Sequence, residues 1–418
     1  HCGRRHLLLM KLLYTCMVYL GGWLTVPISW FSPKIREWRQ GRKVFPSPKP
    51  DCDRPVWIHC ASLGEFEQAR PVLEAIREEF QWPILLSFFS PSGYRIRKDY
   101  PGADQVIYLP LDTPANARCF ISTFRPRLAI MVKYDLWFNH LQACLNENIP
   151  LVLISAHFTS GHWLFKRWAR PFRQILMAFN RIFVQDESSM RILIEHGFSR
   201  VIQAGDTRID RILQLPDESR ALPVLEEFTG PHPVLVAGST WPKDEGLLLE
   251  VMPAWLDQGW KLILVPHDIH PNHIQDLETQ WSAHAMQTMS HFNHGQPAQV
   301  LLVDQIGLLA YLYRYATLVY IGGGFGAGIH NTLEPMAYGK PVFFGPRYHQ
   351  FPEASFLIES GSGQVIHQPS DLEHAMHYFK DTPQRAHCRE QIAFYLASSQ
   401  GATEKILAYL RREFPRME

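Results

Sequence analysis

The sequence has little net charge and no Cys-x-x-Cys pair. Its 418 residues carry a formal net charge of +1 at pH 7, and only 19% of them are charged. Such a chain lacks the basic excess that nucleic-acid-binding proteins use, so we expect no nucleic-acid partner. The seven cysteines are scattered along the chain. Their spacing favours buried thiols in a reducing compartment.

Charge is absent altogether from one segment near the N-terminus. Leu12–Phe31 comprises twenty uncharged residues, about enough to cross a bilayer once. A basic flank follows directly, made of Lys34, Arg36, Arg39, Arg42 and Lys43. The positive-inside rule keeps such a flank on the cytoplasmic side. We therefore expect residues 1–43 to attach the protein to membrane lipids, with the rest of the chain on the cytoplasmic face.

Other interpretations of this segment differ in how deeply it enters a membrane. A cleaved signal peptide fits less well, because the basic cluster lies on the wrong side and no small-residue cleavage site precedes it. Gly21, Gly22 and Pro27 weaken a rigid span, so a helix lying in the membrane interface also fits. A buried amphipathic helix is the remaining alternative.

The rest of the chain is too long for one ordinary core. Short apolar runs alternate with helical segments, which is typical of α/β domains with parallel sheets. The runs begin at Val56, Pro83, Gln105, Arg127, Pro150, Arg181, Val234, Lys261, Gln299, Thr317 and Lys340. We expect an N-terminal domain at 44–206, a linker at 207–232, a C-terminal domain at 233–400 and a last helix at 401–418.

A glycine-rich turn, GGGFGAG, occupies Gly322–Gly328 after one of the second-domain strands. Gly322, Gly323 and Gly324 permit positive φ angles and a close approach of other groups to the backbone. This suits a small anionic group resting against N–H groups. A purely structural turn is the alternative.

The residues after this turn favour a nucleotide site. His330 and Asn331 follow, and Asn331 or Thr332 can cap a helix that begins near Leu333. The N-terminus of that helix suits a phosphate. Glu334, in its first turn, could accept ribose hydroxyl hydrogens. The alternative is an acidic first-turn residue with only a structural role.

The first domain offers a carboxylate at a strand–helix junction. Ser62, Gly64 and Glu65 lie in HCASLGE, where the first expected strand ends and the first expected helix begins. A carboxylate held there can act as a general base toward an acceptor hydroxyl, with Ser62 holding the loop. An ordinary first-turn glutamate, favoured by the helix dipole, is an equally good interpretation of these residues alone.

Further polar residues follow the strands of the second domain. Gly238, Ser239 and Thr240 can donate hydrogen bonds to a phosphate, and His267 follows the next strand near the expected nucleotide. Trp241 either stacks on a base or packs against the protein.

One histidine-rich segment, HDIHPNH at His267–His273, resembles a metal-binding motif. Pro271 interrupts the helix that would bring its imidazoles together, and no nearby Cys or acidic set completes a tetrahedral site. We therefore expect no metal.

Together these motifs resemble those of the Kdo transferases, which attach 3-deoxy-D-manno-octulosonic acid (Kdo) to lipid A precursors. The family pattern of a glycine-rich turn, His-Asn, Leu-Glu-Pro and Gly-x-Pro-Val-x-x-Gly-Pro is present at 322–346. The resemblance continues in His59–Glu65, Ser90–Tyr94, Asp135–Asn139, Phe183–Glu187, Ala204–Arg211, Ala237–Thr240 and Leu264–Asp268. It covers nearly the whole chain, including the apolar N-terminal segment.

The resemblance implies a GT-B glycosyltransferase fold, with two Rossmann-like domains facing a central cleft. It implies an inverting transfer of Kdo from CMP-Kdo to a lipid IVA-like acceptor in lipopolysaccharide core biosynthesis, without a metal ion or another cofactor. Glu65 is then the base, and the second domain binds the CMP-sugar. Arg208 aligns with a basic residue of relatives and becomes a candidate for the CMP phosphate; an exposed linker charge is its alternative. The implied location is the inner membrane of a Gram-negative cell.

One motif departs from the family pattern. Many members read Glu-Thr-Glu-Leu-Trp-Pro-Asn where this chain has Lys133–Asn139. Lys133 could pair with the carboxylate of the sugar acid or with an acceptor phosphate, or it could simply reach solvent. Asp135 supplies a shortened carboxylate. Two alternative functions stay open: a GT-B enzyme acting on a UDP-sugar, as a transferase or 2-epimerase, and a catalytically silent, membrane-tethered nucleotide-sugar binder.

Overall fold

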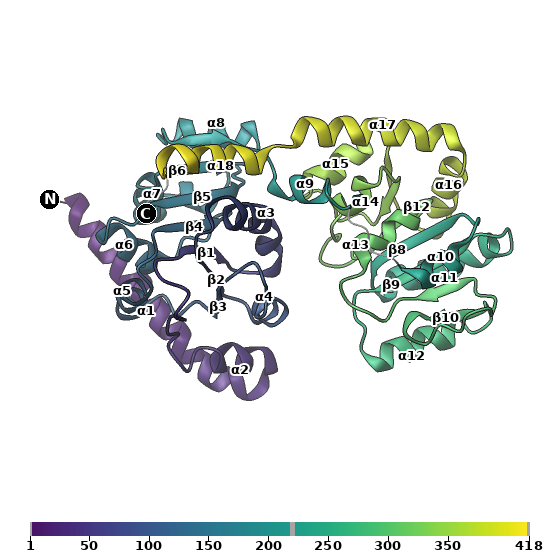
Figure 1. The fold of residues 1–418 in the computed structure, drawn as a ribbon, viewed down its shortest axis with the longest axis horizontal. Coiled ribbons are helices and arrows are strands. Elements are labelled where there is room, and N and C mark those ends of the chain that lie inside the picture. Colours follow the sequence, from purple (N-terminus) through teal and green to yellow (C-terminus); the bar gives the residue numbers. More distant parts are fainter. Residues whose placement is uncertain (1, 218–221, 416–418) are drawn as a thin grey trace. The chain divides into compact units, whose positions relative to one another are not determined.

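The computed structural model of the protein describes residues 2–217 and 222–415. Its contacts divide the chain into two compact units, one formed by 1–210 with 400–418 and the other by 211–399 (Figure 1). Residues 218–221 of the predicted linker lie outside the described residues. So do residue 1 of the predicted anchor and residues 416–418 of the predicted last helix.

The first unit contains a parallel sheet with the strand order β3-β2-β1-β4-β5-β6-β7 among the described residues. Its strands are β1 (Val56–Cys60), β2 (Ile84–Phe88), β3 (Gln105–Tyr108), β4 (Leu128–Val132), β5 (Leu151–Ala156), β6 (Arg181–Val184) and β7 (Val201–Gln203). The central strands are buried on both faces, which explains why their sequences are continuously apolar.

Successive side chains of β1 point to opposite faces of this sheet and so enter two different cores. The helices of this unit that cover the sheet or follow it are α3 (Leu63–Phe80), α4 (Pro91–Arg97), α5 (Pro114–Phe124), α6 (Phe138–Asn146), α7 (Arg170–Met177), α8 (Glu187–Glu195), α9 (Thr207–Ile212) and α18 (Ala402–Glu413). Trp57 packs in the core under α5, α6, α7 and α8, whereas Val56 and Ile58 pack in the core under α3, α4 and α18. Two short 3₁₀ helices, η1 (Trp163–Phe165) and η2 (Arg167–Ala169), precede α7.

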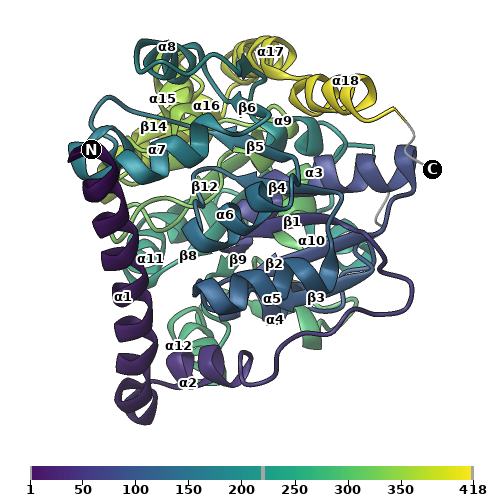
Figure 2. The same cartoon turned by 90° about the vertical axis from the view of Figure 1, so that its left-hand side faces the viewer.

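The apolar N-terminal segment forms one helix, α1 (Cys2–Phe31), which continues through Gly21, Gly22 and Pro27. Its stretch Leu9–Phe31 has the length and composition to cross a membrane, with a mean hydropathy of 1.4. The helix lies along the side of the first unit, beside α7 (Figure 2). A second helix, α2 (Pro33–Gln40), follows after Ser32, whose hydroxyl accepts the Ile35 N–H.

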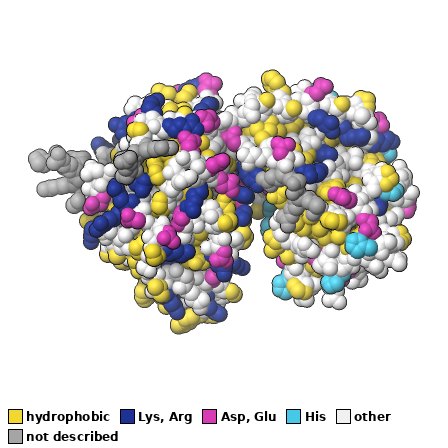
Figure 3. All heavy atoms as spheres, viewed as in Figure 1, with side chains coloured by type: hydrophobic (Ala, Val, Ile, Leu, Met, Phe, Trp, Pro, Cys, Tyr) yellow, Lys and Arg dark blue, Asp and Glu magenta, His cyan; other side chains and the backbone are white. Residues whose placement is uncertain are grey.

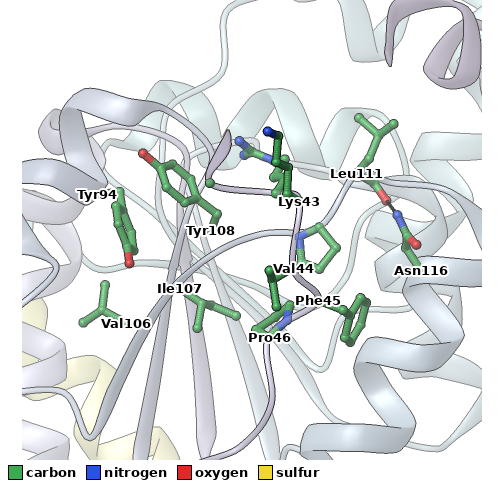
Figure 4. A pocket seen from close by; sticks show the side chains of 13 residues that line it. Lys43, Val44, Phe45, Pro46, Tyr94, Val106, Ile107, Tyr108, Leu111 and Asn116 are labelled. Atoms are coloured by element: carbon green, nitrogen blue, oxygen red, sulfur yellow. Dashed lines mark hydrogen bonds between the residues drawn. The ribbon is translucent and has the colours of Figure 1, made fainter. Parts of the chain in front are cut away.

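One residue of the basic flank after α1 is sequestered by the protein itself. Arg42 donates hydrogen bonds to the carbonyl oxygens of Leu109 (2.9 Å) and Phe89 (2.7 Å), and its guanidinium lies over the rings of Trp38, Phe89 and Tyr108. Burial lowers the pKa of Arg42 to about 9. A cavity of about 350 Å³ adjoins it, and Figure 4 shows Tyr108 on its wall. Arg42 therefore fixes the segment after α2 to the sheet, and its guanidinium is not presented to lipid head groups.

The second unit contains a parallel sheet with the order β10-β11-β9-β8-β12-β13-β14 among the described residues. Its strands are β8 (Val234–Thr240), β9 (Lys261–Pro266), β10 (Met286–Thr288), β11 (Val300–Leu302), β12 (Leu318–Ile321), β13 (Val342–Phe344) and β14 (Gly363–Val365). Its helices are α10 (Pro223–Thr229), α11 (Pro242–Leu256), α12 (Pro271–Gln280), η3 (Met289–His291), α13 (Leu309–Leu312), η4 (Tyr313–Tyr315), α14 (Leu333–Ala337), α15 (Pro352–Glu359), α16 (Pro369–Phe379) and α17 (Thr382–Ser399).

Large aromatic side chains fill one core of the second unit. Trp255 of α11 and Trp281, which follows α12, pack with Met376 of α16 against Leu235 and Phe343 of the sheet.

Positive and negative side chains are intermixed on the face that Figure 3 shows, in keeping with the net charge of +1.

The cysteines depart in part from the prediction of buried thiols. Cys52, Cys60, Cys144 and Cys388 are buried, but Cys16 and Cys119 are exposed. The prediction is therefore wrong for these two, since Cys16 lies on the exposed surface of α1 and Cys119 on that of α5. The side chain of Cys2 lies outside the described residues.

Candidate functional site

Several predicted site residues lie where the strand order of each sheet reverses. In the first sheet this point lies between β1 and β4, and in the second between β8 and β12. Parallel strands bring their carboxyl ends to one edge, and ligands of open α/β sheets bind outside that edge at the reversal point. Glu65 follows β1 and Asp135 follows β4, while the glycine turn follows β12.

Glu65 is held in the first turn of α3. Its Oε2 accepts the backbone N–H of Ser62 at 2.8 Å, the reciprocal half of a capping box. Gly64 is exposed beside it, and Glu65 itself is half-buried. The capping contact occupies one carboxylate oxygen and fixes the orientation of the group.

Asp135 lies beside Glu65, near enough for a hydrogen bond between the two side chains. Its Oδ2 also accepts the N–H of Ala61 at 3.0 Å. Burial and then the Glu65 charge raise the pKa of Asp135 well above its ordinary value, against a smaller lowering by Lys133. The neighbouring carboxylate therefore favours the protonated form of Asp135, because two adjacent carboxylates cannot readily both ionise.

A buried histidine, which was not among the predicted site residues, supports this pair. His59 Nε2 accepts the indole N–H of Trp137 at 2.8 Å and lies 4.0 Å from Asp135 Oδ2, and its Nδ1 is 2.8 Å from Ser87 Oγ. Burial lowers the pKa of His59 to about 3, so the ring is neutral and acts as an acceptor for Trp137. The only sequence signal was its place in a strand that precedes the Ser-x-Gly-Glu motif.

Lys133 ends β4 in the left-handed region, at φ 58°. It lies near Asp135 and His157, and its charge opposes in small part the other influences, which raise the pKa of both groups. His157 in turn bonds Asp186 at 2.7 Å. The cation that departs from the family pattern is therefore half-buried beside the carboxyl pair and does not simply extend into solvent.

The glycines after β12 allow three strand ends to approach one another. A Cβ on Gly322 would lie 2.3 Å from the carbonyl oxygen of Ser239, and one on Gly324 would lie 2.5 Å from the Cα of Gly345. Gly323 has φ 92° and donates its N–H to Asp244 at 3.0 Å. The Gly322 N–H likewise bonds the Gly238 carbonyl. These two N–H groups serve the packing of the turn and do not point at a ligand here.

Asp244 joins the turn to the first helix of the second unit. It is buried and accepts hydrogen bonds from Tyr320 Oη (2.7 Å), the Trp241 N–H (2.9 Å) and the Gly323 N–H. The carboxylate therefore links β12, the end of β8 and the glycine turn. This role was not predicted, because a Lys-Asp-Glu run is typical of an exposed helix start.

Three aromatic rings stack at the same edge. Trp241 and His267 have centroids 4.6 Å apart, as do His267 and His330. The Trp241 Nε1–H donates to His330 Nε2 at 3.1 Å. Burial and then the neighbouring His267 lower the pKa of His330 to about 4, so it is a neutral acceptor at pH 7. Trp241 thus packs against two predicted site residues while staying 43% exposed.

Asn331 organises the start of α14. Its Oδ1 accepts the Leu333 N–H and its Nδ2 donates to Glu334 Oε1, both at 3.0 Å. The helix is a single turn of 5 residues, so its dipole is smaller than a full helix would supply. Thr332 occupies the cap position, but its side chain makes no capping bond.

Three residues at the end of β8, Gly238–Thr240, are held by contacts within the second unit. A Cβ on Gly238 would lie 2.3 Å from Tyr313 Oη, so only glycine fits beneath that ring. Ser239 has φ 54° and lies where the pairing of β8 with β9 shifts register. The Thr240 hydroxyl donates to the buried Glu245 at 3.1 Å. Glu245 also forms a hydrogen bond with His273 at 3.0 Å. This histidine of the segment His267–His273 thus has a carboxylate partner.

Arg208 lies in the first unit, in α9. Its guanidinium bonds Asp206 through Nε (2.9 Å) and Nη2 (2.6 Å). Among the side chains that the structure describes, no three His, Cys, Asp or Glu residues are placed to hold a metal ion.

A cavity of about 460 Å³ opens over the glycine turn of the second unit. Its walls include Trp241, Lys243, Asp244, Phe325 and His330. This volume is in the range of ligand sites, which is about 300–1,000 Å³. Aromatic faces, a cation and a glycine backbone here form a surface suited to a base and a phosphate.

Comparison with known proteins places these features in a family context. Residues 36–211 match the family model described as 3-Deoxy-D-manno-octulosonic-acid transferase (kdotransferase). The 3-deoxy-D-manno-octulosonic acid transferase of Bordetella pertussis is 26% identical over 390 residues, 88% of this chain and 89% of that protein. The chain is similar to the Kdo transferases over most of its length. The Haemophilus influenzae transferase of the same name is 26% identical over 403 residues, 91% of this chain and 92% of that protein.

The solved structures agree with the observed fold. UDP-GlcNAc 2-epimerase from Neisseria meningitidis bound to UDP-GlcNAc has a TM-score of 0.61 at 14% identity, over 86% of this chain and 100% of that one. This likeness concerns the fold alone. The predicted resemblance, the GT-B fold class and the enzyme class, glycosyltransferase, are confirmed. This similarity supports Kdo transfer in lipopolysaccharide biosynthesis.

Proposed function

We propose that the protein transfers Kdo from CMP-Kdo to a lipid IVA-like acceptor, with inversion at the anomeric carbon and without a metal ion. The observation that carries this proposal is the Glu65–Asp135 pair at the reversal point of the first sheet. Sequence relationship supports the Kdo part of the reaction. The identity of the donor nucleotide, the identity of the acceptor and the stereochemistry of transfer are the parts that we propose in addition.

Glu65 takes the proton of the acceptor hydroxyl in this proposal. The acceptor oxygen then bonds the anomeric carbon of Kdo, the bond from that carbon to the CMP phosphate breaks, and CMP leaves. The Ser62 N–H bond to Oε2 holds the carboxylate while Oε1 faces the hydroxyl. A protonated Asp135 adjoins the base without adding a second negative charge.

Lys133 is proposed to neutralise the carboxylate of the sugar acid. Its ammonium lies near Asp135 and so within the same group of residues as the base. A cation at this place holds an anionic donor sugar close to the attacking oxygen, which favours transfer. An acceptor phosphate is the second anion that could use it.

The CMP moiety is proposed to bind the cavity of the second unit. Trp241 and Lys243, which line this cavity, would face the base and the phosphate. Glu334, in the first turn of α14, would accept ribose hydroxyl hydrogens. The predicted residues Gly238, Ser239, Thr240, His267 and the glycine turn act mainly by shaping this wall. Arg208 is proposed to approach the CMP phosphate through a guanidinium that Asp206 orients.

Attachment to the cytoplasmic face of the inner membrane is part of the proposal. The apolar helix α1 and the exposed cations Lys34, Arg36 and Lys43 support it. Anionic lipids attract such cations, and an acceptor embedded in the membrane would meet the enzyme there.

The experiment is mass spectrometry of lipid IVA after incubation with CMP-Kdo and the purified protein. We expect the acceptor to gain the mass of Kdo and CMP to be released. Calorimetry with CMP and with UDP separates this proposal from a UDP-sugar enzyme, because only CMP should bind tightly. Unmodified lipid IVA, with the protein folded and CMP bound, would contradict the proposed transfer.

A further inference from the structure

The first unit contains a second cavity, which the proposed chemistry does not use. It has a volume of about 530 Å³ and lies between α1 and the segments that follow β4 and β5. Leu13 and Met17 of α1 line one side, and Trp163, Trp168 and Phe172 line the other. The cavity is of ligand size.

The walls of this cavity are mostly apolar, and their aromatic rings pack against one another. Trp163 and Trp168 stack with centroids 5.6 Å apart and an interplanar angle of 14°. Phe172 makes edge contacts with Trp163 and with Tyr14 of α1, both at 5.3 Å. Such ring pairs contribute stability beyond that of the apolar area they bury, so they help to fix the positions of the rings.

Helix α1 is fixed as a wall by polar contacts with the rest of the unit. The Tyr14 hydroxyl donates to the buried Asp112 at 2.7 Å, and the Lys11 ammonium donates to Gln142 at 3.4 Å. A Cβ on Gly22 would lie 2.7 Å from Leu111, so the helix also approaches the unit closely further along. A helix used only as a flexible tether would not need such contacts.

The inner end of the cavity reaches the proposed active site. Asp135 and Trp137 line it there, and Asp135 is the partner of Glu65. The indole N–H of Trp137 is already bonded to His59, so it presents an apolar face. The outer end is bordered by Leu13 and Met17, which are 48% and 69% exposed on the apolar surface of α1.

We propose that this cavity binds one acyl chain of the acceptor lipid, so that α1 forms a wall of the acceptor site. The inference rests on the proposed function, since it assigns a place to a part of the acceptor. A chain can pass from a membrane along the apolar surface of α1 into the cavity without exposure to water, which burial of methylene groups favours. Its polar head then lies toward Glu65, where the reacting hydroxyl is needed.

The test uses two matched variants of the full chain, Met17→Trp and Leu20→Trp. Both positions are exposed on α1, at 69% and 57%, but only Met17 lines the cavity. Both changes add an apolar ring to the helix surface, so vesicle flotation should be the same. Met17→Trp should narrow the cavity, whereas Leu20→Trp should leave it open.

The first readout is photolabelling with palmitate that carries a diazirine, in phosphatidylglycerol vesicles without CMP-Kdo. In the wild type and in Leu20→Trp we expect label on the peptide that contains Trp163, Trp168 and Phe172. Met17→Trp should lose most of it. Label confined to the outer surface of α1, or equal label in both variants, would overturn the proposal. This readout needs no transfer, so it stands or falls independently of the proposed reaction.

The second readout is the KM for acceptors with different numbers of chains. Met17→Trp should raise the KM for lipid IVA about tenfold relative to Leu20→Trp, which corresponds to about 1.4 kcal/mol. The KM for a fully deacylated acceptor and the affinity for CMP should be equal in both variants. An equal KM for lipid IVA in the two variants would overturn the proposal.

Discussion

The carboxyl group of Asp135 lies beside that of Glu65, where β4 and β1 end at the same edge of the first sheet. The two groups come from segments far apart in the chain, and each also holds a backbone N–H, Ala61 for Asp135 and Ser62 for Glu65. The proposed base and its partner are thus oriented by the loop that joins β1 to α3. This explains how a first-turn glutamate can be positioned for proton transfer.

The raised pKa of Asp135 predicts a pH-dependent cost to stability. Below the ordinary carboxyl pKa of about 3.9, both the folded and the unfolded chain are protonated at this site and the cost is absent. As pH rises above that value, the unfolded chain releases its proton while the folded protein retains it, so stability falls. Asp135→Asn removes this cost. We expect its Tm to exceed that of the wild type at pH 8 and to approach it near pH 4.

The control for this measurement is Asp99→Asn, because the Asp99 side chain is 88% exposed. Its Tm difference from the wild type should not depend on pH in this way. A constant difference for Asp135→Asn between pH 4 and pH 8 would contradict the assigned protonation of Asp135.

The glycine turn predicts a position-specific effect of adding one methyl group. Gly324→Ala places a Cβ 2.5 Å from the Gly345 Cα, whereas Gly326→Ala places its Cβ 3.5 Å from the nearest atom, the Gly323 carbonyl oxygen. We expect Gly324→Ala to lower the free energy of unfolding by about 1–3 kcal/mol, the usual cost of overpacking. Gly326→Ala should change it little. Urea denaturation of both variants measures the difference, and equal stabilities would mean that the turn does not need close approach.

Glu334 predicts a change in nucleotide affinity. Removing an acceptor for buried ribose hydroxyls costs about 1–3 kcal/mol, so Glu334→Ala should weaken CMP binding by about 10- to 100-fold. Glu359→Ala, an exposed change on α15 of the same unit, is the control. Calorimetry with CMP makes the comparison independent of turnover. Unchanged CMP affinity in folded Glu334→Ala would leave this residue with a structural role only.

Much of the fold was predictable because the central strands are buried on both faces. Continuous apolar runs such as those of β1, β4 and β8 have no other explanation in a chain with helical segments between them. The strands that the sequence did not indicate are β7, β10 and β14. Each of these strands has only three residues and lies at an edge of its sheet. A short strand with one neighbour has too few residues to show a period.

The candidate site was predictable only at its motifs. The Ser-x-Gly-Glu segment and the glycine turn are local patterns, so their residues could be named from the sequence. The roles of His59 and Asp244 depend on contacts between distant segments, with Trp137 in one case and with Tyr320 in the other. No spacing within the chain encodes such contacts. The docking of α1 through Tyr14 and Asp112 was missed for the same reason.

The most direct test of the central claim is the transfer rate of Glu65→Gln with CMP-Kdo and lipid IVA. The glutamine side-chain oxygen can still accept the Ser62 N–H, so fold and CMP affinity should be preserved. Loss of a general base typically lowers turnover by about 100-fold or more, and we expect that decrease here. Transfer of Kdo by folded Glu65→Gln at near the wild-type rate would contradict the assignment of Glu65 as the base.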